Sequence, residues 1–115
     1  MATNLKISHF QNLNPVIHEK TRLAIMTFLI SSQEASFSEL KNELQLTDGN
    51  LNLHMRVLEK NGYAKVHKSF VHRRPRTTYQ VTEKGVRAFQ EYVSLLERIL
   101  RISRRGRTER LADPS

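Results

Sequence analysis

Apolar residues recur every three or four positions through the first half of the chain, which is the spacing of amphipathic helices. The first such segment opens with Asn14 and Pro15, which suit an N-cap and a first helical position. Asn accepts hydrogen bonds from the free amides of a first turn, and Pro lacks the donor that would be wasted there. The pattern predicts a helix over about residues 15–31.

Two shorter helices are predicted next, joined by a short turn. Ser36 and Glu39 stand at the spacing of a capping box, which indicates a helix over about residues 37–45. Thr47 can cap a further helix over residues 47–61. Two short helices connected in this way form the helix-turn-helix arrangement.

The helix predicted over residues 47–61 has two contrasting faces. Leu51, Met55 and Leu58 lie at i, i+4 and i+7 and form one buried stripe. A helix that faces only water usually carries Glu and Lys on its outer side. The outer side of this helix carries small, amide-bearing and apolar residues with a single Arg, namely Gly49, Asn52, Leu53 and Arg56. Such a face is expected to contact another molecule.

Beyond this helix the spacing changes from helical to alternating. The alternation predicts two short strands, over residues 63–69 and 77–81, which make a small hairpin. Between them lies an arginine-rich turn in which Pro75 is expected to interrupt the ladder. From Lys60 to Thr82 there are six Lys or Arg residues and no Asp or Glu. The hairpin is therefore a basic patch suited to a phosphate backbone.

A long last helix is predicted over residues 83–104, with apolar residues spaced three and four apart as in a coiled coil. One small domain cannot cover so long a seam, so its distal part is expected to pair with a second copy of the chain. The apolar N-terminal arm, residues 1–14, is expected to pack across the same interface. Residues 105–115 lose the periodicity and are predicted to be a basic, flexible tail.

Composition narrows the classes of function. The 115 residues suffice for one domain, residues 1–115, and carry a formal net charge of +8, which favours a polyanionic partner. The chain has no cysteine, no leader-like N-terminus and no apolar run long enough for a membrane span, so a cytoplasmic, soluble protein is expected. It shows no catalytic triad pattern and no phosphate-binding glycine loop. We therefore predict no enzyme activity and no cofactor.

A run of motif residues continues from the third predicted helix through the hairpin into the last helix. These residues are Gly49, Asn50, Leu51, His54, Met55, Leu58, Glu59, Gly62, Tyr63, Thr77, Tyr79, Val81, Thr82 and Gly85. With this motif, residues 14–100 resemble the winged helix-turn-helix transcriptional regulators of the MarR and ArsR group. The resemblance implies a mainly α fold with a small β-hairpin wing over residues 66–79 and a long C-terminal dimerisation helix.

The same resemblance implies a homodimeric repressor that reads a pseudo-palindromic operator, with helix 47–61 in the major groove and the wing on the backbone or in the minor groove. Asn suits adenine and Arg suits guanine in direct base readout. The predicted DNA-binding residues are Ser38, Thr47, Gly49, Asn50, Asn52, Leu53, His54, Arg56, Lys68, His72, Arg73, Arg74 and Arg76. The predicted homodimer-interface residues are Leu5, Phe10, Leu13, Phe89, Val93, Leu96 and Leu100.

Several alternatives stay open at the level of sequence. His54 lies at the flank of the buried stripe, so packing competes with a phosphate contact. His67 and His72 share the hairpin but have no carboxylate or Cys beside them, and no metal site is predicted. A small-molecule effector could enter a crevice lined by Phe10, Phe89 and Tyr92, or these rings simply fill it. The rival function is a winged-helix module that binds protein or RNA without operator specificity.

Overall fold

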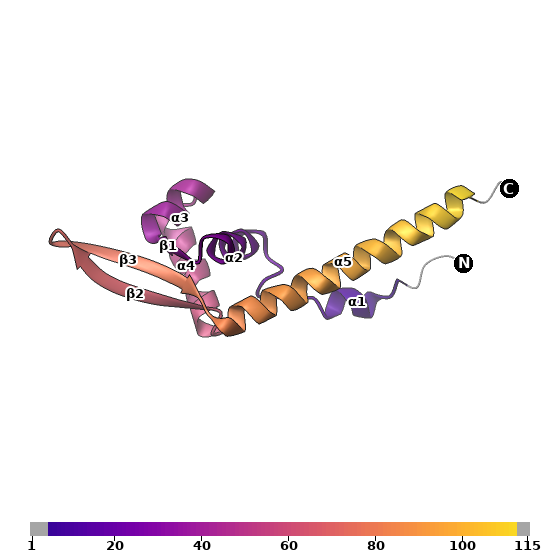
Figure 1. Ribbon diagram of the computed structural model, residues 1–115, viewed down its shortest axis with the longest axis horizontal. Helices are drawn as coiled ribbons and strands as arrows, with labels where there is room; N and C mark the ends of the chain where they lie inside the picture. Colours follow the sequence, from indigo (N-terminus) through magenta and orange to yellow (C-terminus); the bar gives the residue numbers. More distant parts are fainter. Residues whose placement is uncertain (1–4, 113–115) are drawn as a thin grey trace.

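The computed structural model describes residues 5–112 of the chain. Figure 1 shows a small group of helices from which a hairpin projects to one side and a long helix to the other. The elements in chain order are α1 (Ile7–Gln11), α2 (Lys20–Ser32), β1 (Glu34–Ser36), α3 (Phe37–Leu44), α4 (Asp48–Lys60), β2 (Ala64–Val71), β3 (Arg74–Val81) and α5 (Glu83–Ala112). We call residues 20–82 the head, and α1 together with α5 the shaft.

The first long helix begins later than predicted. Asn14 acts as a cap, since its Oδ1 accepts a hydrogen bond from the amide of Val16 at 2.9 Å, but it caps only a short turn. Glu19 then adopts an extended backbone conformation, and its side chain caps α2, which starts at Lys20. A second capping residue thus interrupts the helix that the apolar pattern predicted from residue 15.

The caps of the next two helices confirm the prediction. Ser36 and Glu39 form the capping box of α3, each side chain bonding the other residue's amide at 3.0 Å. The hydroxyl of Thr47 accepts a hydrogen bond from the amide of Asn50 at 3.1 Å and opens α4. These contacts are local in sequence, which is why the spacing of residue types reveals them.

The sheet contains a strand that the sequence did not predict. The hairpin strands β2 and β3 pair antiparallel, and β1 pairs with the other edge of β3, giving the strand order β1-β3-β2. Ser36, the last residue of β1, stands opposite Thr78. A strand of three residues is too short to show alternation, and only its pairing with β3 defines it.

The hairpin is longer than predicted and closes in a tight turn. β2 reaches Val71 and β3 begins at Arg74, so most of the segment predicted as a loop is strand. The two turn residues, His72 and Arg73, have φ of 51° and 65°, the left-handed values of a type I′ turn. Because neither is glycine, the tip stores about 1–2 kcal/mol of strain per residue.

The prediction that Pro75 interrupts the ladder is wrong. Pro75 lies inside β3, opposite Phe70. Val71 and Arg74 flank a two-residue turn and form a hydrogen-bonded pair, so the next pair along is non-hydrogen-bonded. The nitrogen of Pro75 therefore points away from β2, to the other edge of β3. At Pro75 that edge is not paired with β1, which reaches only residues 78–80. The missing N–H costs no ladder hydrogen bond.

The core of the head closes within one chain. Residues from α2, β1, α3, α4 and the hairpin meet in one buried cluster, and its Ile, Leu and Met side chains are 0–1% exposed. The cluster contains Ile25, Met26, Leu29, Ala35, Leu40, Leu51, Met55, Leu58, Ala64 and Tyr79. It includes the whole inner stripe predicted for α4.

A tight junction connects the head to α5. Thr82 caps α5, accepting a hydrogen bond from the amide of Gly85 at 2.9 Å, and it donates to the carbonyl of Gly62 at 2.6 Å. A Cβ atom at Gly85 would collide with the carbonyl oxygen of Tyr63. This close approach explains why glycine stands here in the sequence.

The shaft differs from the prediction at both ends. α5 continues to Ala112, so the backbone of residues 105–112 is helical and the predicted end at residue 104 is wrong. In the N-terminal arm, Leu13 is only 6% exposed and joins Ile17, Tyr92 and Ile99 in a second buried cluster. Residues 1–4 and 113–115 of the arm and tail lie outside the described residues.

Candidate nucleic-acid interface

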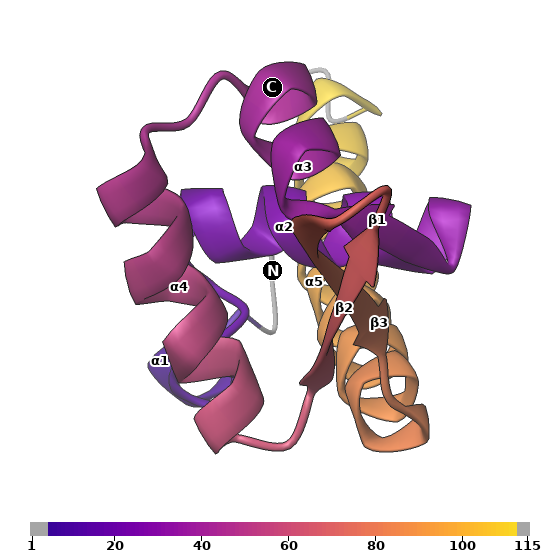
Figure 2. The ribbon, with the colours of Figure 1, turned by 90° about the vertical axis from the view of Figure 1, so that its left-hand side faces the viewer.

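The outer face of α4 is free of contacts with the core. Figure 2 shows α4 on the flank of the head, beside the hairpin. Leu51, Met55 and Leu58 are buried on its inner side, while Asn52 and Arg56 are exposed on the other. Its exposed leading turn contains Thr47, Gly49 and Asn50, and Leu53, on the outer face, is 58% exposed.

A crevice between α4 and the hairpin brings predicted site residues from both elements together. It has a volume of about 440 Å³. Its walls include Asn52 and Arg56 from α4, and Lys68 and Thr77 from β2 and β3. Sequence analysis did not single out Thr77 as a site residue, because only the pairing of the strands turns it toward α4. The crevice offers an amide, a guanidinium and an ammonium group within one opening, together with the carboxylate of Glu59.

His54 lies between α4 and α2, as the packing alternative describes. Its side chain is 15% exposed, and its Nδ1 stands 3.0 Å from Nη1 of Arg22 and 3.6 Å from Oε1 of Glu19. A guanidinium can only donate and a carboxylate can only accept, so Nδ1 bonds one or the other of these neighbours according to the tautomer of the ring. Only the small exposed part of the ring remains available for the predicted DNA contact.

Glu19 anchors this group of side chains. Partial burial opposes its ionisation, but hydrogen bonds from the amides of Arg22 and Thr21, with weaker attraction to His54 and Arg22, hold the pKa of Glu19 below its usual value. The carboxylate therefore stays ionised at neutral pH. It fixes the start of α2 against the middle of α4 and so sets the position of the exposed helix.

The acidic residue at the start of α4 is paired. Asp48 would repel DNA phosphates, yet its Oδ1 lies 2.8 Å from Nζ of Lys41 in α3. Both side chains are largely exposed to solvent, so the pair adds little to stability. Its effect is on the local field, because Lys41 offsets the charge of Asp48 beside the first turn of α4.

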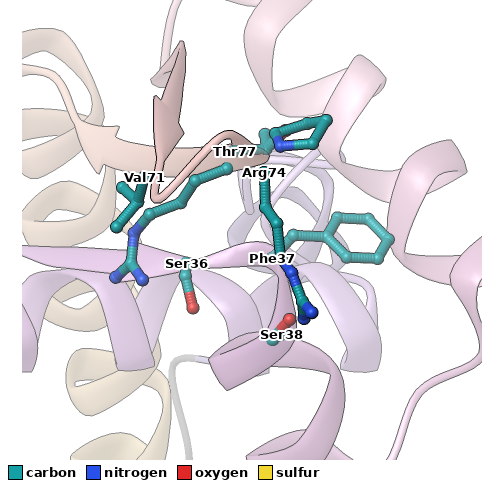
Figure 3. Close-up of a pocket in the computed structure, with 8 residues that line it drawn as sticks. Ser36, Phe37, Ser38, Val71, Arg74 and Thr77 are labelled. Carbon is teal, nitrogen blue, oxygen red and sulfur yellow. The ribbon is translucent and has the colours of Figure 1, made fainter.

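A second hollow lies between the hairpin and α3 (Figure 3). Arg74 and Arg76 line it together with Ser36 and Ser38 at the start of α3, and its volume is about 390 Å³. Hydrogen bonds from the amide and hydroxyl of Ser36, with a weaker effect of Arg76, hold the pKa of Glu39 below its usual value. The hollow is thus lined by two guanidinium groups and the exposed Ser38, an arrangement that fits the predicted contacts with the DNA backbone.

The hairpin tip projects far from the helices of the head, as Figure 1 shows. Lys68, His72 and Arg73 are exposed there. Phe70 is exposed as well, at 75%, and sequence analysis did not single it out. The signal that could have found it is its even spacing from Val66 and Lys68, which places all three on one face of β2.

Within residues 5–112 no group of three or more His, Cys, Asp or Glu side chains is placed to hold a metal ion. His67 stands opposite Thr78 in the strand, whereas His72 belongs to the turn. None of the helices in the described region is long and apolar enough to cross a bilayer.

The predicted dimer-interface residues divide into two groups. Leu13 is buried within its own chain, and Phe89, Val93 and Leu96 are partly buried against the same cluster. Leu5, Phe10 and Leu100 are exposed on the shaft. Ile7, which is 71% exposed, belongs with the exposed group. A second copy of the chain could therefore contact the exposed group most directly.

The crevice predicted for an effector is only partly present. Tyr92 lines a hollow of about 450 Å³ next to Asn14 and Tyr63. Its hydroxyl is 2.8 Å from Nδ1 of His18, and burial raises the pKa of Tyr92. Phe89 packs against both core clusters, and Phe10 is exposed on α1. Of the three predicted rings, Tyr92 therefore lines this hollow, whereas Phe89 packs in the core and Phe10 faces solvent.

A helix-turn-helix, an exposed polar face on its second helix and a basic hairpin beside that face define a DNA-binding winged helix. Comparison with known families agrees. The sequence model of the winged helix DNA-binding domain family matches residues 21–100, and the chain belongs to this family. The resemblance inferred from the motif residues is confirmed.

Individual relatives support the same assignment. The chain is 35% identical over 78 residues to an uncharacterised protein, MJ0432, of Methanocaldococcus jannaschii, covering 68% of this chain and 85% of that protein. A transcriptional regulator homologue from Pyrococcus horikoshii superposes with a TM-score of 0.76 at 34% identity, covering 81% of this chain and 94% of the other.

A MarR-family regulator from Enterococcus faecalis shares the fold, with a TM-score of 0.69 at 23% identity, covering 90% of this chain and 93% of the other. The fold, mainly helical with a small antiparallel sheet and a long C-terminal helix, is that of transcriptional regulators. The protein is accordingly a DNA-binding regulator of the winged-helix type.

Proposed function

We propose that the protein is a homodimeric transcriptional repressor that reads a pseudo-palindromic operator. The observation that carries the proposal is the crevice that joins Asn52 and Arg56 of α4 to Lys68 of the hairpin. It presents base-reading and phosphate-binding groups in one opening. A dimer seated on its operator would exclude other proteins from that DNA, which is the basis for proposing repression.

Base reading is assigned to the outer face of α4. A helix enters the major groove of B-DNA when its leading turn is slim, and Gly49 makes it so here. Arg56 can bond the two acceptors of guanine, Asn52 can bond adenine, and Leu53 can contact the methyl group of thymine. The first amides of α4, next to Thr47, can hold a phosphate at the groove edge.

Backbone binding is assigned to the hairpin and the start of α3. Arg74, Arg76 and Ser38 share one hollow, and Lys68 and Arg73 lie exposed on the hairpin. Each phosphate neutralised adds about 0.9 to the slope of log affinity against log salt. Binding should therefore be strongly dependent on salt.

Homodimerisation is assigned to the shaft. Ile7, Phe10 and Leu100 are large apolar side chains exposed on α1 and α5. Pairing two shafts about a two-fold axis would cover them and would place two α4 helices for successive major grooves, about 34 Å apart. The operator should then have two related half-sites at that spacing.

The test begins with selection of bound fragments from random DNA, followed by gel-shift titration on the selected site. Arg56→Ala is expected to weaken binding about 10- to 100-fold and to relax preference at one base position. The double variant Arg73→Ala/Arg74→Ala is expected to lower the salt slope by about 1.8 if each residue contacts one phosphate. Arg98→Ala on α5 removes one positive charge away from the crevice and is the matched control.

Unchanged affinity and unchanged salt slope in both variants would overturn the proposal. Enrichment of no common sequence, together with binding to single-stranded RNA or to a protein, would favour the rival function of a winged-helix interaction module. A selected site without two-fold symmetry would retain DNA binding and overturn only the dimeric arrangement.

A further inference from the structure

The hairpin tip carries an aromatic ring that is 75% exposed, on Phe70. We propose that Phe70 is a wedge that enters the minor groove of bound DNA, separates a base step and kinks the duplex. The inference rests on the proposed function and goes beyond it, because it assigns the protein a DNA-deforming activity in addition to reading. Apolar side chains inserted between base steps act in this way in architectural DNA-binding proteins.

The position of Phe70 follows from the pleat of β2. Side chains two residues apart share a face of a strand. Val66 and Lys68 line the crevice that faces α4, so Phe70 lies on the same face, farther out along the hairpin. DNA that occupies the crevice therefore continues past Phe70.

The reach of the hairpin matches the geometry of the duplex. Four residues of strand separate Val66 from Phe70, which corresponds to about 13 Å. A helical repeat of about 34 Å places the adjacent minor groove about 17 Å from the centre of the major groove. With α4 in the major groove, the tip arrives at the minor groove next to it.

The backbone that carries the ring is fixed before any DNA binds. Phe70 stands opposite Pro75 in a non-hydrogen-bonded pair, the pair in which side chains lie closest across a hairpin. Pro75 is rigid, and the turn of His72 and Arg73 ends the arm in only two residues. A narrow, stiff tip loses little freedom on insertion.

The charge of the hairpin indicates which partner this apolar tip contacts. The segment from residue 60 to residue 82 contains six Lys or Arg residues and no acid. Two such tips would repel each other, so a second copy of the chain is disfavoured. The minor groove has a strongly negative potential and attracts basic arms, while its floor offers stacked bases to an apolar ring.

The experiment uses the full-length protein and a DNA site selected from random sequence. The bend is measured by fluorescence energy transfer between the two ends of the site. Unstacking is measured by the fluorescence of 2-aminopurine placed at each step of the minor groove that flanks the α4 contact. Wild-type protein is expected to bend the site by about 20–90° and to raise the fluorescence at one step.

Phe70→Ala is expected to lose at least half of the bend and the 2-aminopurine signal while it keeps its sequence preference. Phe70→Leu should keep part of both, because leucine is also found as a wedge. Val71→Ala is the matched control. Val71 is exposed at the same tip, but as the next residue of the strand its side chain points to the opposite face from Phe70, so its loss should leave the bend unchanged.

The outcomes separate the wedge from the proposed function. If wild-type protein binds no duplex, the proposed function itself fails. If it binds specifically but the site stays straight, or if Phe70→Ala bends DNA as wild type does, the wedge is wrong and the proposed function stands. A change of oligomeric state in Phe70→Ala, measured by sedimentation, would assign the ring to a contact between copies and would likewise overturn the wedge.

Discussion

The head and the shaft use apolar residues in opposite ways. In the head, Leu40 and Leu51 are completely buried by the same chain, and the outer side of α4 is mainly polar. On the shaft, Ile7 and Leu100 are exposed although α5 is the longest helix described. The core of the head is therefore closed by one chain, and its exposed apolar residues, such as Leu53 and Phe70, lie on the proposed DNA-binding surface, whereas those of the shaft lie on the proposed dimer interface.

The largest effect is expected in the core of the head. Leu51→Ala should lower the free energy of unfolding by about 2–5 kcal/mol, because it leaves a cavity in a closed core. Leu53→Ala, two residues along the same helix and 58% exposed, should change it by less than about 0.5 kcal/mol. Urea denaturation of both variants measures the difference. Equal losses would mean that α4 does not have the inner and outer faces described.

The next effect concerns the shaft. Leu100→Asp should raise the dissociation constant of the homodimer about 10- to 100-fold, because it places a charge in the proposed interface. The circular dichroism spectrum of the variant, which reports its secondary structure, should remain unchanged. Leu53→Asp introduces the same charge at an exposed leucine of the head and should leave sedimentation unaltered. A Leu100→Asp protein that stays dimeric would remove α5 from the interface.

A smaller effect is expected at the contact between α2 and α4. Glu19→Ala removes the cap of α2 and should cost about 1 kcal/mol at pH 7. Because the folded-state pKa of Glu19 is lowered, its contribution is present above the unfolded value and is lost as pH falls through the folded value. The difference from wild type should therefore shrink in acid, below about pH 4.

Thermal unfolding as a function of pH measures this contribution. Glu97→Ala, an exposed glutamate on α5, is the control and should differ little from wild type at any pH. If the difference between wild type and Glu19→Ala grows as pH falls, the sign assigned to the Glu19 carboxylate is incorrect.

The smallest effect lies at the leading turn of α4. Asp48→Asn should strengthen DNA binding by about 2- to 5-fold at low salt, because one carboxylate is removed beside the phosphates and Lys41 becomes free to meet them. The gain should fade at high salt. Gel shifts at two salt concentrations measure it, with Glu97→Gln on the shaft as the charge-matched control. A loss of affinity would show that the pair with Lys41 positions the helix.

Features fixed by neighbouring residues could be predicted from the sequence. The caps at Ser36 and Thr47 and the inner stripe of α4 depend on residues a few positions apart. β1 and the place of Pro75 could not be predicted, since each depends on which strand lies alongside. Leu13 was assigned to the dimer interface for the same reason, because its apolar character does not reveal which helix covers it.

The candidate site divides along the same line. Residue type and spacing identify Asn52 and Arg56 as outward-facing, and the structure brings them to one crevice with Lys68. The enclosure of His54 by Arg22 and Glu19 depends on the contact between α2 and α4, which no local spacing encodes. The pairing of Asp48 with Lys41 is likewise a contact between helices.

The junction at Thr82 has a mechanical consequence. A single residue separates the last strand of the hairpin from α5, and it is bonded on both sides, to Gly62 and to Gly85. This short, hydrogen-bonded connection holds the hairpin and α5 at a fixed angle to each other. In the proposed dimer, a change in the angle at which the two α5 helices cross would therefore move both hairpins and alter their contacts with DNA.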